Sequence, residues 1–162
     1  MTAADSYELS MAVRRLLQAG RQMQATAARQ MGLRVTDVQA MDLVTASKNK
    51  ISPKELADRL GIRTASASVL IDRLTDAGHL RRSPAERTEG APRRHRTNVS
   101  ATDHARTEAR RTLQTVNDGF RELGAGLTAD EAAVVMNFLH RATDILRTYA
   151  TDTEESPTEP SR

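Results

Sequence analysis

The sequence predicts a mainly α-helical chain with one small β-hairpin. Apolar residues recur at helical spacing along most of its length, and capping residues precede several of these runs. A stretch rich in Arg, Pro and Gly between residues 79 and 100 interrupts this pattern and is typical of a hairpin with a long loop. The centre of the chain, residues 51–79, is typical of two helices joined by a tight turn, with the remaining elements flanking it.

Composition excludes several classes of protein. The 162 residues suffice for one domain with extensions. No stretch approaches the roughly 20 apolar residues of a membrane span, and the N-terminus lacks the pattern of a signal peptide, so we expect a cytoplasmic protein with no membrane partner. Because the chain has no cysteine, disulfides, thiol-based redox sensing and thiolate metal sites are excluded.

Charge is unevenly distributed. The chain carries a net charge of +3, whereas residues 151–162 hold four acidic residues against one Arg and carry −3, which leaves +6 on residues 1–150. A basic body followed by an acidic tail rich in Pro, Ser and Thr is typical of a polyanion-binding domain that ends in disorder.

Two helices are expected before the central unit. An apolar stripe from Ser6 to Met31 ends at Gly32, and it is longer than a small domain needs, which indicates a partner. Thr36, Asp37 and Gln39 are typical of a capping box that opens a second helix. The buried side of that helix is expected to consist of Val38, Met41, Leu43 and Val44.

The first central helix has clear start and stop signals. Ser52 and Glu55 form a capping box around Pro53, and the hydrophobic pair Ile51 and Leu56 brackets it. Gly61 supplies a residue that adopts the left-handed conformation at little cost. The helix should therefore end there.

The second central helix has an unusual outward face. Thr64 is expected to cap it and Gly78 to close it, with Ala67, Leu70, Ile71 and Leu74 facing a core. Its outward positions in the first two turns carry short side chains that would let the backbone approach a DNA groove and hydroxyls that can bond phosphates or base edges. These positions are Thr64, Ala65, Ser66, Ser68 and Val69. The alternative is that the face packs on another helix.

The interruption between residues 79 and 100 is interpreted as a β-hairpin with Leu80 and Val99 facing inward. Its net charge of +4 between Leu80 and Asn98 comes from arginine alone, and arginine suits phosphate and a narrow minor groove. The alternative is a solvated surface loop.

Two helices are expected at the C-terminal end. Thr102 caps the first, which should run to about Leu123 before Gly124 and Gly126 break it. Thr128 and Glu131 then form a capping box for a last helix with an apolar stripe. Together with the opening helix, these long apolar faces favour a helical dimer interface.

Catalytic and metal chemistry are not expected. No arrangement of nucleophile, base and orienting residue appears, and no glycine-rich phosphate loop. The four histidines have no ligand spacing with another histidine or a cysteine, so neither a metal site nor a cofactor is expected. They are His79, His95, His104 and His140.

The chain resembles the MarR-type winged helix-turn-helix transcriptional regulators over about residues 9–150. Three motifs carry this resemblance: residues 52–57 (SPKELA) with residues 60–61 (LG), residues 69–74 (VLIDRL) with residues 77–80 (AGHL), and residues 101–103 (ATD). The resemblance implies a homodimer held by its terminal helices, with the recognition helix in a major groove of double-stranded DNA and the wing at a minor groove.

The resemblance also implies site residues. It puts Arg63, Thr64, Ser66 and Ser68 at the groove-reading end and Asp72 with Arg73 as an orienting pair near the DNA backbone. It also implies that Arg94 lies at the wing tip, where this chain has Arg93-Arg94 in place of the family's usual Asp-Arg pair. The candidate DNA-binding residues are Arg63, Thr64, Ser66, Ser68, Arg73, Arg87, Arg93, Arg94 and Arg96.

The expected organisation has four parts. Residues 1–33 and 101–150 dimerise, residues 34–100 form the winged helix-turn-helix, and residues 151–162 form a disordered acidic tail. The expected function is sequence-specific binding of a pseudo-palindromic operator as a homodimer. The resemblance implies repression and release by a small-molecule effector, whose pocket residues the sequence does not indicate. Two alternatives stay open. The protein could activate transcription from the same class of promoter, or it could be a winged-helix module that binds protein without specific DNA binding.

Overall fold

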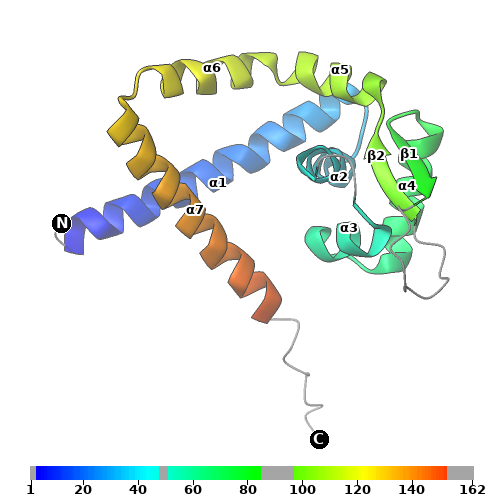
Figure 1. Cartoon of the computed structure of the whole chain (residues 1–162), viewed down its shortest axis with the longest axis horizontal. Helices are drawn as coiled ribbons and strands as arrows, with labels where there is room; N and C mark the ends of the chain where they lie inside the picture. The colour runs from blue at the N-terminus through cyan, green and yellow to red at the C-terminus, as the bar shows by residue number, and fades with distance from the viewer. Residues whose placement is uncertain (1–2, 48–50, 85–96, 153–162) are drawn as a thin grey trace, which may run out of the picture. The chain divides into compact units, whose positions relative to one another are not determined.

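The computed structural model describes residues 3–47, 51–84 and 97–152 (Figure 1). The chain forms two compact units, Met1–Gln114 and Thr115–Arg162. The boundary between them falls inside the predicted dimerisation segment 101–150, and the assignment of dimerisation to that segment stays a prediction.

The first unit is a helical assembly with one β-hairpin, as the sequence predicted. In chain order its elements are α1 (Ala3–Met31), α2 (Val35–Ala46), α3 (Pro53–Leu60), α4 (Thr64–Asp76), β1 (Leu80–Pro84), β2 (Thr97–Ala101) and α5 (Asp103–Thr112). The second unit contains α6 (Gln114–Ala125), apart from its first residue, and α7 (Ala129–Asp152).

The main hydrophobic core lies among α2, α3, α4 and the hairpin. Its fully buried side chains come from all of these elements and bring α4 against both α3 and β1. They include Val44, Ile51, Leu56, Ile71, Leu74, Leu80 and Val99. A smaller cluster of Ala27, Ala28 and Val38 joins α1 to α2, with Leu113 packed against it. The outward face of α4 is therefore mounted on a well-packed support.

The hairpin pairs β1 antiparallel with β2, placing Leu80 opposite Ala101 and Pro84 opposite Thr97. Leu80 and Val99 are buried, which confirms the predicted inward positions. Ile51 adds a bridge on the other side of β2, because the Val99 amide donates to the Ile51 carbonyl oxygen at 2.8 Å. The base of the wing is thus joined to Ile51, two residues before α3 begins.

Several predicted caps are confirmed. The Ser52 hydroxyl accepts a hydrogen bond from the Glu55 amide at 3.2 Å, and the Thr102 hydroxyl accepts one from the Ala105 amide at 3.2 Å. Gly61 ends α3 in the left-handed conformation at φ 64°. These residues fix where α3 and α5 begin and where α3 turns toward α4.

Two predicted helix starts were wrong. Thr64 does not cap α4: it is the first helical residue, and Arg63 holds the extended capping position. The capping box at Thr36 and Gln39 is also misplaced, because α2 begins at Val35 and the Asp37 carboxylate accepts from the Arg34 amide at 3.1 Å. In both cases an arginine holds the capping position although a residue with a better capping side chain follows it.

The predicted single helix from Thr102 to about Leu123 was also wrong. It forms two helices, α5 and α6, interrupted at Leu113, whose backbone lies at φ −100° and ψ 10°. Leu113 packs against the small cluster between α1 and α2. Tertiary packing at this leucine therefore accompanies a break that the local sequence pattern does not reveal.

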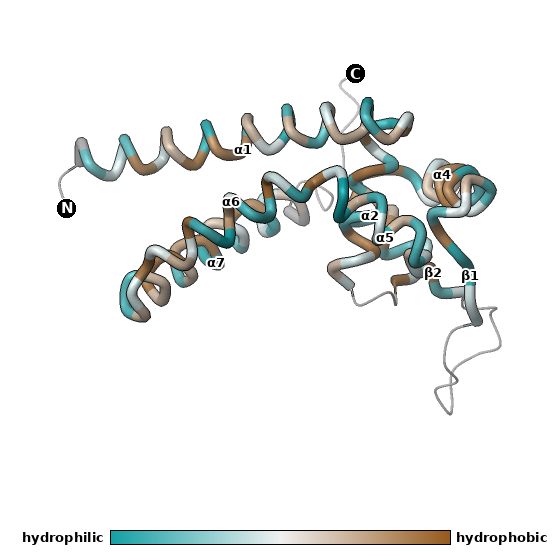
Figure 2. The backbone as a smooth tube through the Cα atoms, turned by 90° about the horizontal axis from the view of Figure 1, so that it is seen from above, coloured by the Kyte–Doolittle hydropathy of each residue, from teal (hydrophilic) through white to brown (hydrophobic). Residues whose placement is uncertain are grey.

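The second unit has apolar helices without a buried core. Thr128 and Glu131 form the predicted capping box at the start of α7, with the Thr128 amide donating to Glu131 at 2.9 Å. Figure 2 shows hydrophobic positions recurring along both α6 and α7. Among the described residues C-terminal to Ala105, no hydrophobic side chain is buried.

Helix α7 continues to Asp152, while residues 153–162 of the predicted tail lie outside the described residues.

None of the helices in the described part of the chain has the length and apolar character to cross a membrane.

Candidate nucleic-acid interface

Helix α4 presents an exposed face of short side chains. Thr64, Ala65 and Ser66 are exposed, Ser68 is half-buried, and Val69 leaves 62 % of its surface accessible. The opposite side of the same helix carries Leu70, Ile71 and Leu74 into the core. The first turn of α4 contains no acidic residue. This face can approach a polyanion closely and offers hydroxyl groups for hydrogen bonds.

The start of α4 differs from the starts of α3 and α5. No side-chain hydrogen bond caps its first-turn amides, whereas Ser52 caps α3 and Thr102 caps α5. Arg63, exposed in the extended conformation, immediately precedes these amides. A helix N-terminus carries partial positive charge, and an adjacent guanidinium adds a full charge. The end of α4 that carries the short side chains is therefore suited to phosphate.

Arg73 faces the support of α4. Its guanidinium forms an ion pair with the carboxylate of Asp37, a buried residue in the first turn of α2. The second carboxylate oxygen of Asp37 accepts the Arg34 amide. Arg73 and Asp37 lie 36 residues apart in the chain, so their ion pair links α4 to α2. DNA contact by Arg73 stays a prediction, and this geometry favours a positioning role.

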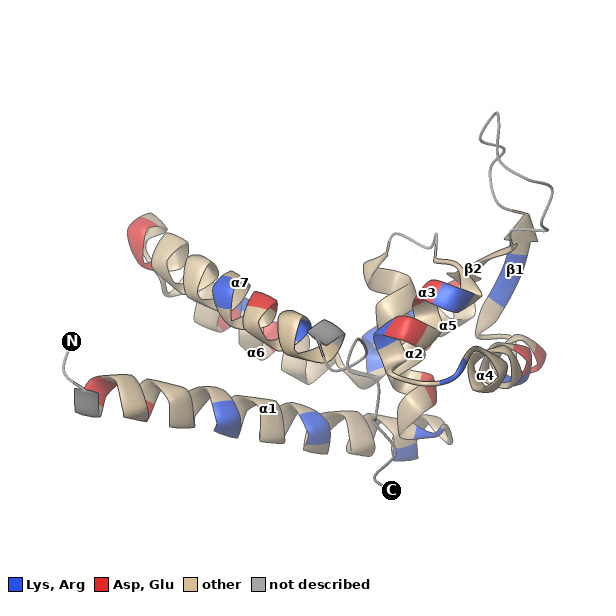
Figure 3. Ribbon diagram, turned by 90° about the horizontal axis from the view of Figure 1, so that it is seen from below, with Lys and Arg blue, Asp and Glu red and all other residues tan. Residues whose placement is uncertain are grey.

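Asp72 faces a different element from Arg73. Its carboxylate lies 2.6 Å from the Arg82 guanidinium on β1, and Arg81 donates to the Ser100 hydroxyl across the hairpin at 3.0 Å. The two residues that were expected to form an orienting pair thus anchor α4 on two sides. Figure 3 shows the basic residues of β1 beside α4. The predicted wing residues Arg87, Arg93, Arg94 and Arg96 lie outside the described residues.

Sequence reasoning did not identify Asp37 and Arg82 as site residues. Asp37 was assigned only to a helix cap, and Arg82 only to the overall charge of the hairpin. An acidic residue that falls on the buried side of a predicted helix, as Asp37 does beside Val38 and Met41, was the available signal, because a buried carboxylate requires a partner.

The comparisons agree with this geometry. A model of the MarR family matches residues 31–89, the segment that contains α2, α3, α4 and the first strand of the wing. The chain resembles the MarR family. No protein with a curated description is significantly similar in sequence.

Solved structures show that the fold is a MarR-type winged helix. Wild-type apo MarR from E. coli is 20 % identical with a TM-score of 0.55, and the match covers 83 % of this chain and 96 % of that chain. A MarR family transcriptional regulator from Silicibacter pomeroyi is 19 % identical with a TM-score of 0.61 over 83 % and 87 % of the two chains. A mutant E. coli MarR complexed with operator DNA is 20 % identical with a TM-score of 0.52 over 85 % and 95 %.

Proposed function

We propose that this protein is a DNA-binding transcriptional regulator with no catalytic role, which binds a two-fold symmetric operator as a homodimer. The observation that carries the proposal is the start of α4, where Arg63, uncapped amides and short exposed side chains share one surface. The mutant E. coli MarR of similar fold was solved with operator DNA, which supports DNA as the partner in this proposal.

Within this surface we assign two kinds of contact. Arg63 and the first-turn amides bind phosphate, which provides affinity without sequence preference. Ser66 and Ser68 reach base edges, and Val69 is placed to contact a thymine methyl group. The ion pair of Arg73 with the buried Asp37 joins α4 to α2, and the more exposed pair of Asp72 with Arg82 joins it to β1.

Dimerisation is inferred from the apolar helices. Helices α6 and α7 expose large hydrophobic side chains, including Phe120, Leu123, Val134, Ile145 and Tyr149, and bury none among the described residues. A second copy of the chain is the partner we propose, because a symmetric regulator needs two recognition helices about one DNA turn apart. We further propose repression relieved by a small-molecule effector, by resemblance to the family.

The test is selection of bound duplexes from a random pool, followed by affinity measurements of the selected site across salt concentrations. We expect a symmetric site bound at least about a thousandfold more tightly than random DNA, with a steep salt dependence. Weak binding without a selected sequence would instead support the protein-interaction alternative.

Three substitutions sharpen this test. Arg63→Ala should weaken binding to specific and random DNA alike. It should also reduce the slope of log affinity against log salt concentration by about one. Ser66→Ala should leave the slope unchanged and relax preference at one base-pair position, by about 1 kcal/mol. Arg110→Ala on α5 is the matched control for charge loss, because this exposed arginine lies outside the proposed surface. A slope change for Arg110→Ala equal to that of Arg63→Ala would contradict the assignment.

A further inference from the structure

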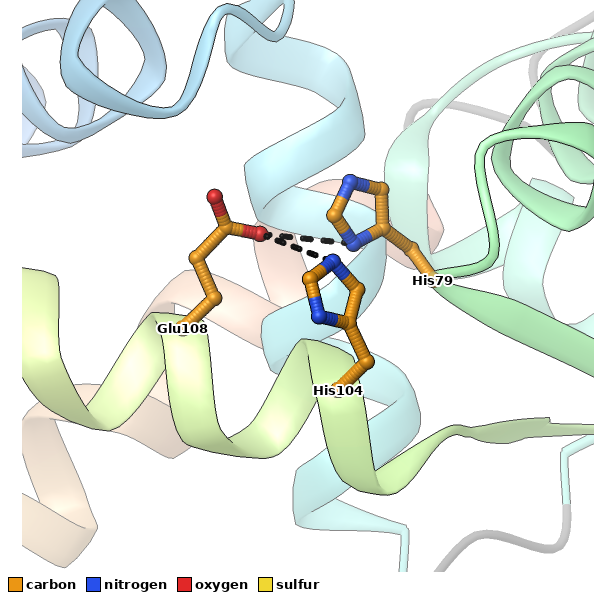
Figure 4. A group of neighbouring side chains, drawn as sticks. All are labelled: His79, His104 and Glu108. Atoms are coloured by element: carbon orange, nitrogen blue, oxygen red, sulfur yellow. Dashed lines mark ion pairs between the residues drawn. The ribbon is translucent and has the colours of Figure 1, made fainter.

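Three potential metal ligands meet at the junction between α4, β1 and α5. His79 lies between the end of α4 and the start of β1, whereas His104 and Glu108 stand one turn apart on α5 (Figure 4). Both imidazoles point toward the Glu108 carboxylate. Its Oε2 atom lies 3.6 Å from His79 Nδ1 and 3.7 Å from His104 Nε2, and one ligand atom from each residue lies within 4.8 Å of the others.

Two of these atoms lack a hydrogen bond. His79 Nδ1 and Glu108 Oε2 are buried and have no hydrogen-bond partner among the described residues, although the His79 side chain is only 7 % exposed. Distances of 3.6 and 3.7 Å exceed the usual hydrogen-bond length, so the ion pairs drawn in Figure 4 do not supply the missing hydrogen bonds. Buried polar atoms without partners are rare in folded proteins, and an ion is one of the groups that can satisfy them.

The spacing fits a first-row transition metal. Ligands that bind Zn²⁺ at about 2.0–2.1 Å in a tetrahedron lie about 3.4 Å from one another. The two distances to Glu108 exceed this by only a few tenths of an ångström. The rings of His79 and His104 are stacked with centroids 5.2 Å apart, and the three ligand atoms all lie within 4.8 Å of one another. Rotation of the two imidazoles would be needed to bring their nitrogens to the separation of a tetrahedral site.

Backbone contacts hold the two halves of the cluster together. The Thr102 hydroxyl donates to the Gly78 carbonyl oxygen at 2.6 Å, and the Thr102 amide donates to the His79 carbonyl oxygen at 3.0 Å. Thr102 also caps α5, the helix that carries the other two ligands. A site braced in this way does not require the chain to reorganise before it binds an ion.

The cluster is open to solvent on one side. His104 is 65 % exposed, and a cavity of about 480 Å³ is lined by Gln30, His104, Thr107, Glu108, Arg111 and Thr112. An ion can enter through this cavity, and water can complete its coordination. Arg111 opposes a cation at the same cavity, which makes the negative charge of Glu108 important for affinity.

We propose that His79, His104 and Glu108 bind a divalent transition-metal ion, with Zn²⁺ as the ion that best suits two imidazoles and one carboxylate. The bound ion joins α5 to the end of α4 and therefore stabilises the attachment of the proposed DNA-reading helix. The metal site itself is independent of the proposed function.

The expectation of no metal site rested on the lack of a histidine paired with another histidine or a cysteine at ligand spacing. His104 and Glu108 are four residues apart on one helix, a spacing that brings two ligands to the same face, and this was the available signal. His79 lies 25 residues earlier than His104, and only the fold brings it to the pair.

The experiment is a Co²⁺ titration of the full chain in the absence of DNA, followed by visible absorption, with Zn²⁺ as competitor. We expect saturable binding of one ion per chain, with bands of the intensity typical of four- or five-coordinate Co²⁺, and displacement by Zn²⁺. His104→Gln and Glu108→Gln should each lower the affinity at least about tenfold. Both positions are partly exposed, so these variants should keep the fold, which circular dichroism checks.

His140→Gln is the matched control, because it removes an exposed histidine of α7 outside the cluster. Its affinity for Co²⁺ should equal that of the wild type. The proposal is overturned if the wild type shows no saturable one-to-one binding, or if folded His104→Gln and Glu108→Gln variants bind Co²⁺ as tightly as the wild type. Because no DNA is present, neither result bears on the proposed regulator function.

Discussion

At the residue scale, the position of α4 depends on the buried carboxylate of Asp37. The Asp37 side chain is 2 % exposed, and it pairs with Arg73 and with the Arg34 amide. Asp37→Ala would leave the Arg73 guanidinium and this amide without their acceptor. We expect a loss of about 2 kcal/mol in the free energy of unfolding, measured by urea denaturation, since removing one partner of a buried pair is costly.

The control for this substitution is Asp58→Ala. Asp58 also pairs with a cation, Lys54, at 2.7 Å, but both side chains are more than half exposed. The expected loss is at most about 0.5 kcal/mol, because solvent screens exposed pairs. Equal losses for the two aspartates would mean that the pair with Arg73 adds nothing to the support of α4.

The residue pairs that position α4 could not be predicted from the sequence. Arg73 and Asp37 are far apart in the chain, and each resembles an ordinary charged residue of a helix. The same holds for Asp72 with Arg82 and for His79 with the ligands on α5. Pattern analysis assigns a residue to a face of its own helix, whereas the partner of that face is determined by packing between elements.

At the scale of the element, the turn between α3 and α4 depends on Gly61. This residue has φ 64°, and a Cβ atom there would meet nothing within 4 Å, so only backbone strain opposes a side chain. We expect Gly61→Ala to lower the free energy of unfolding by about 1 kcal/mol in urea denaturation. Gly124→Ala is the control, since this helical glycine also has open space around it and should gain up to about 1 kcal/mol. If both Gly61→Ala and Gly124→Ala raised the free energy of unfolding, backbone strain at Gly61 would be contradicted.

The start of α7 provides a pH-dependent contribution. Hydrogen bonds from the Thr128 amide and hydroxyl lower the pKa of Glu131 below its ordinary value of 4.5. A lowered pKa in the folded state means stability that is present above 4.5 and lost as the pH falls through the lower folded value. We therefore expect Glu131→Gln to be less stable than the wild type near neutral pH and to approach it in acid.

Thermal unfolding followed by circular dichroism across pH measures this difference. Asp130→Asn is the matched control, because Asp130 also lies in the first turn of α7 but does not accept the bonds from Thr128. A stability difference for Glu131→Gln that persists unchanged through acid pH would show that the charge of the carboxylate is not what matters.

Elements with one strong terminal signal were predicted well, and elements with competing signals were not. Ser52 with Pro53, and Gly61 nine residues later, leave little choice of boundaries for α3, and the structure confirms them. Near the start of α4, Arg63 takes the capping position although Thr64 has the better capping side chain, because the core-facing positions of α4 set where the helix begins. Local propensity yields to packing here.

At the scale of the whole molecule, apolar surface is unequally shared between the two units. The buried core lies entirely in the first unit, while α6 and α7 expose hydrophobic side chains along their length. Two helices with no fully buried side chain among the described residues gain little from folding alone, since burial of apolar surface is the main favourable term. A partner that covers these faces resolves the difficulty, and a second copy is the partner proposed above.

We expect the full chain to sediment as a dimer, and the double substitution Val135→Glu and Leu139→Glu to shift it toward monomer. These residues lie one turn apart on the apolar side of α7, so two charges there would have to be buried without partners in a dimer. Arg141→Glu introduces an acidic residue at an exposed position of the same helix and should leave the dimer intact. Wild-type protein that sediments as a monomer at every concentration would exclude the symmetric mode of DNA binding, even if α4 itself contacts DNA.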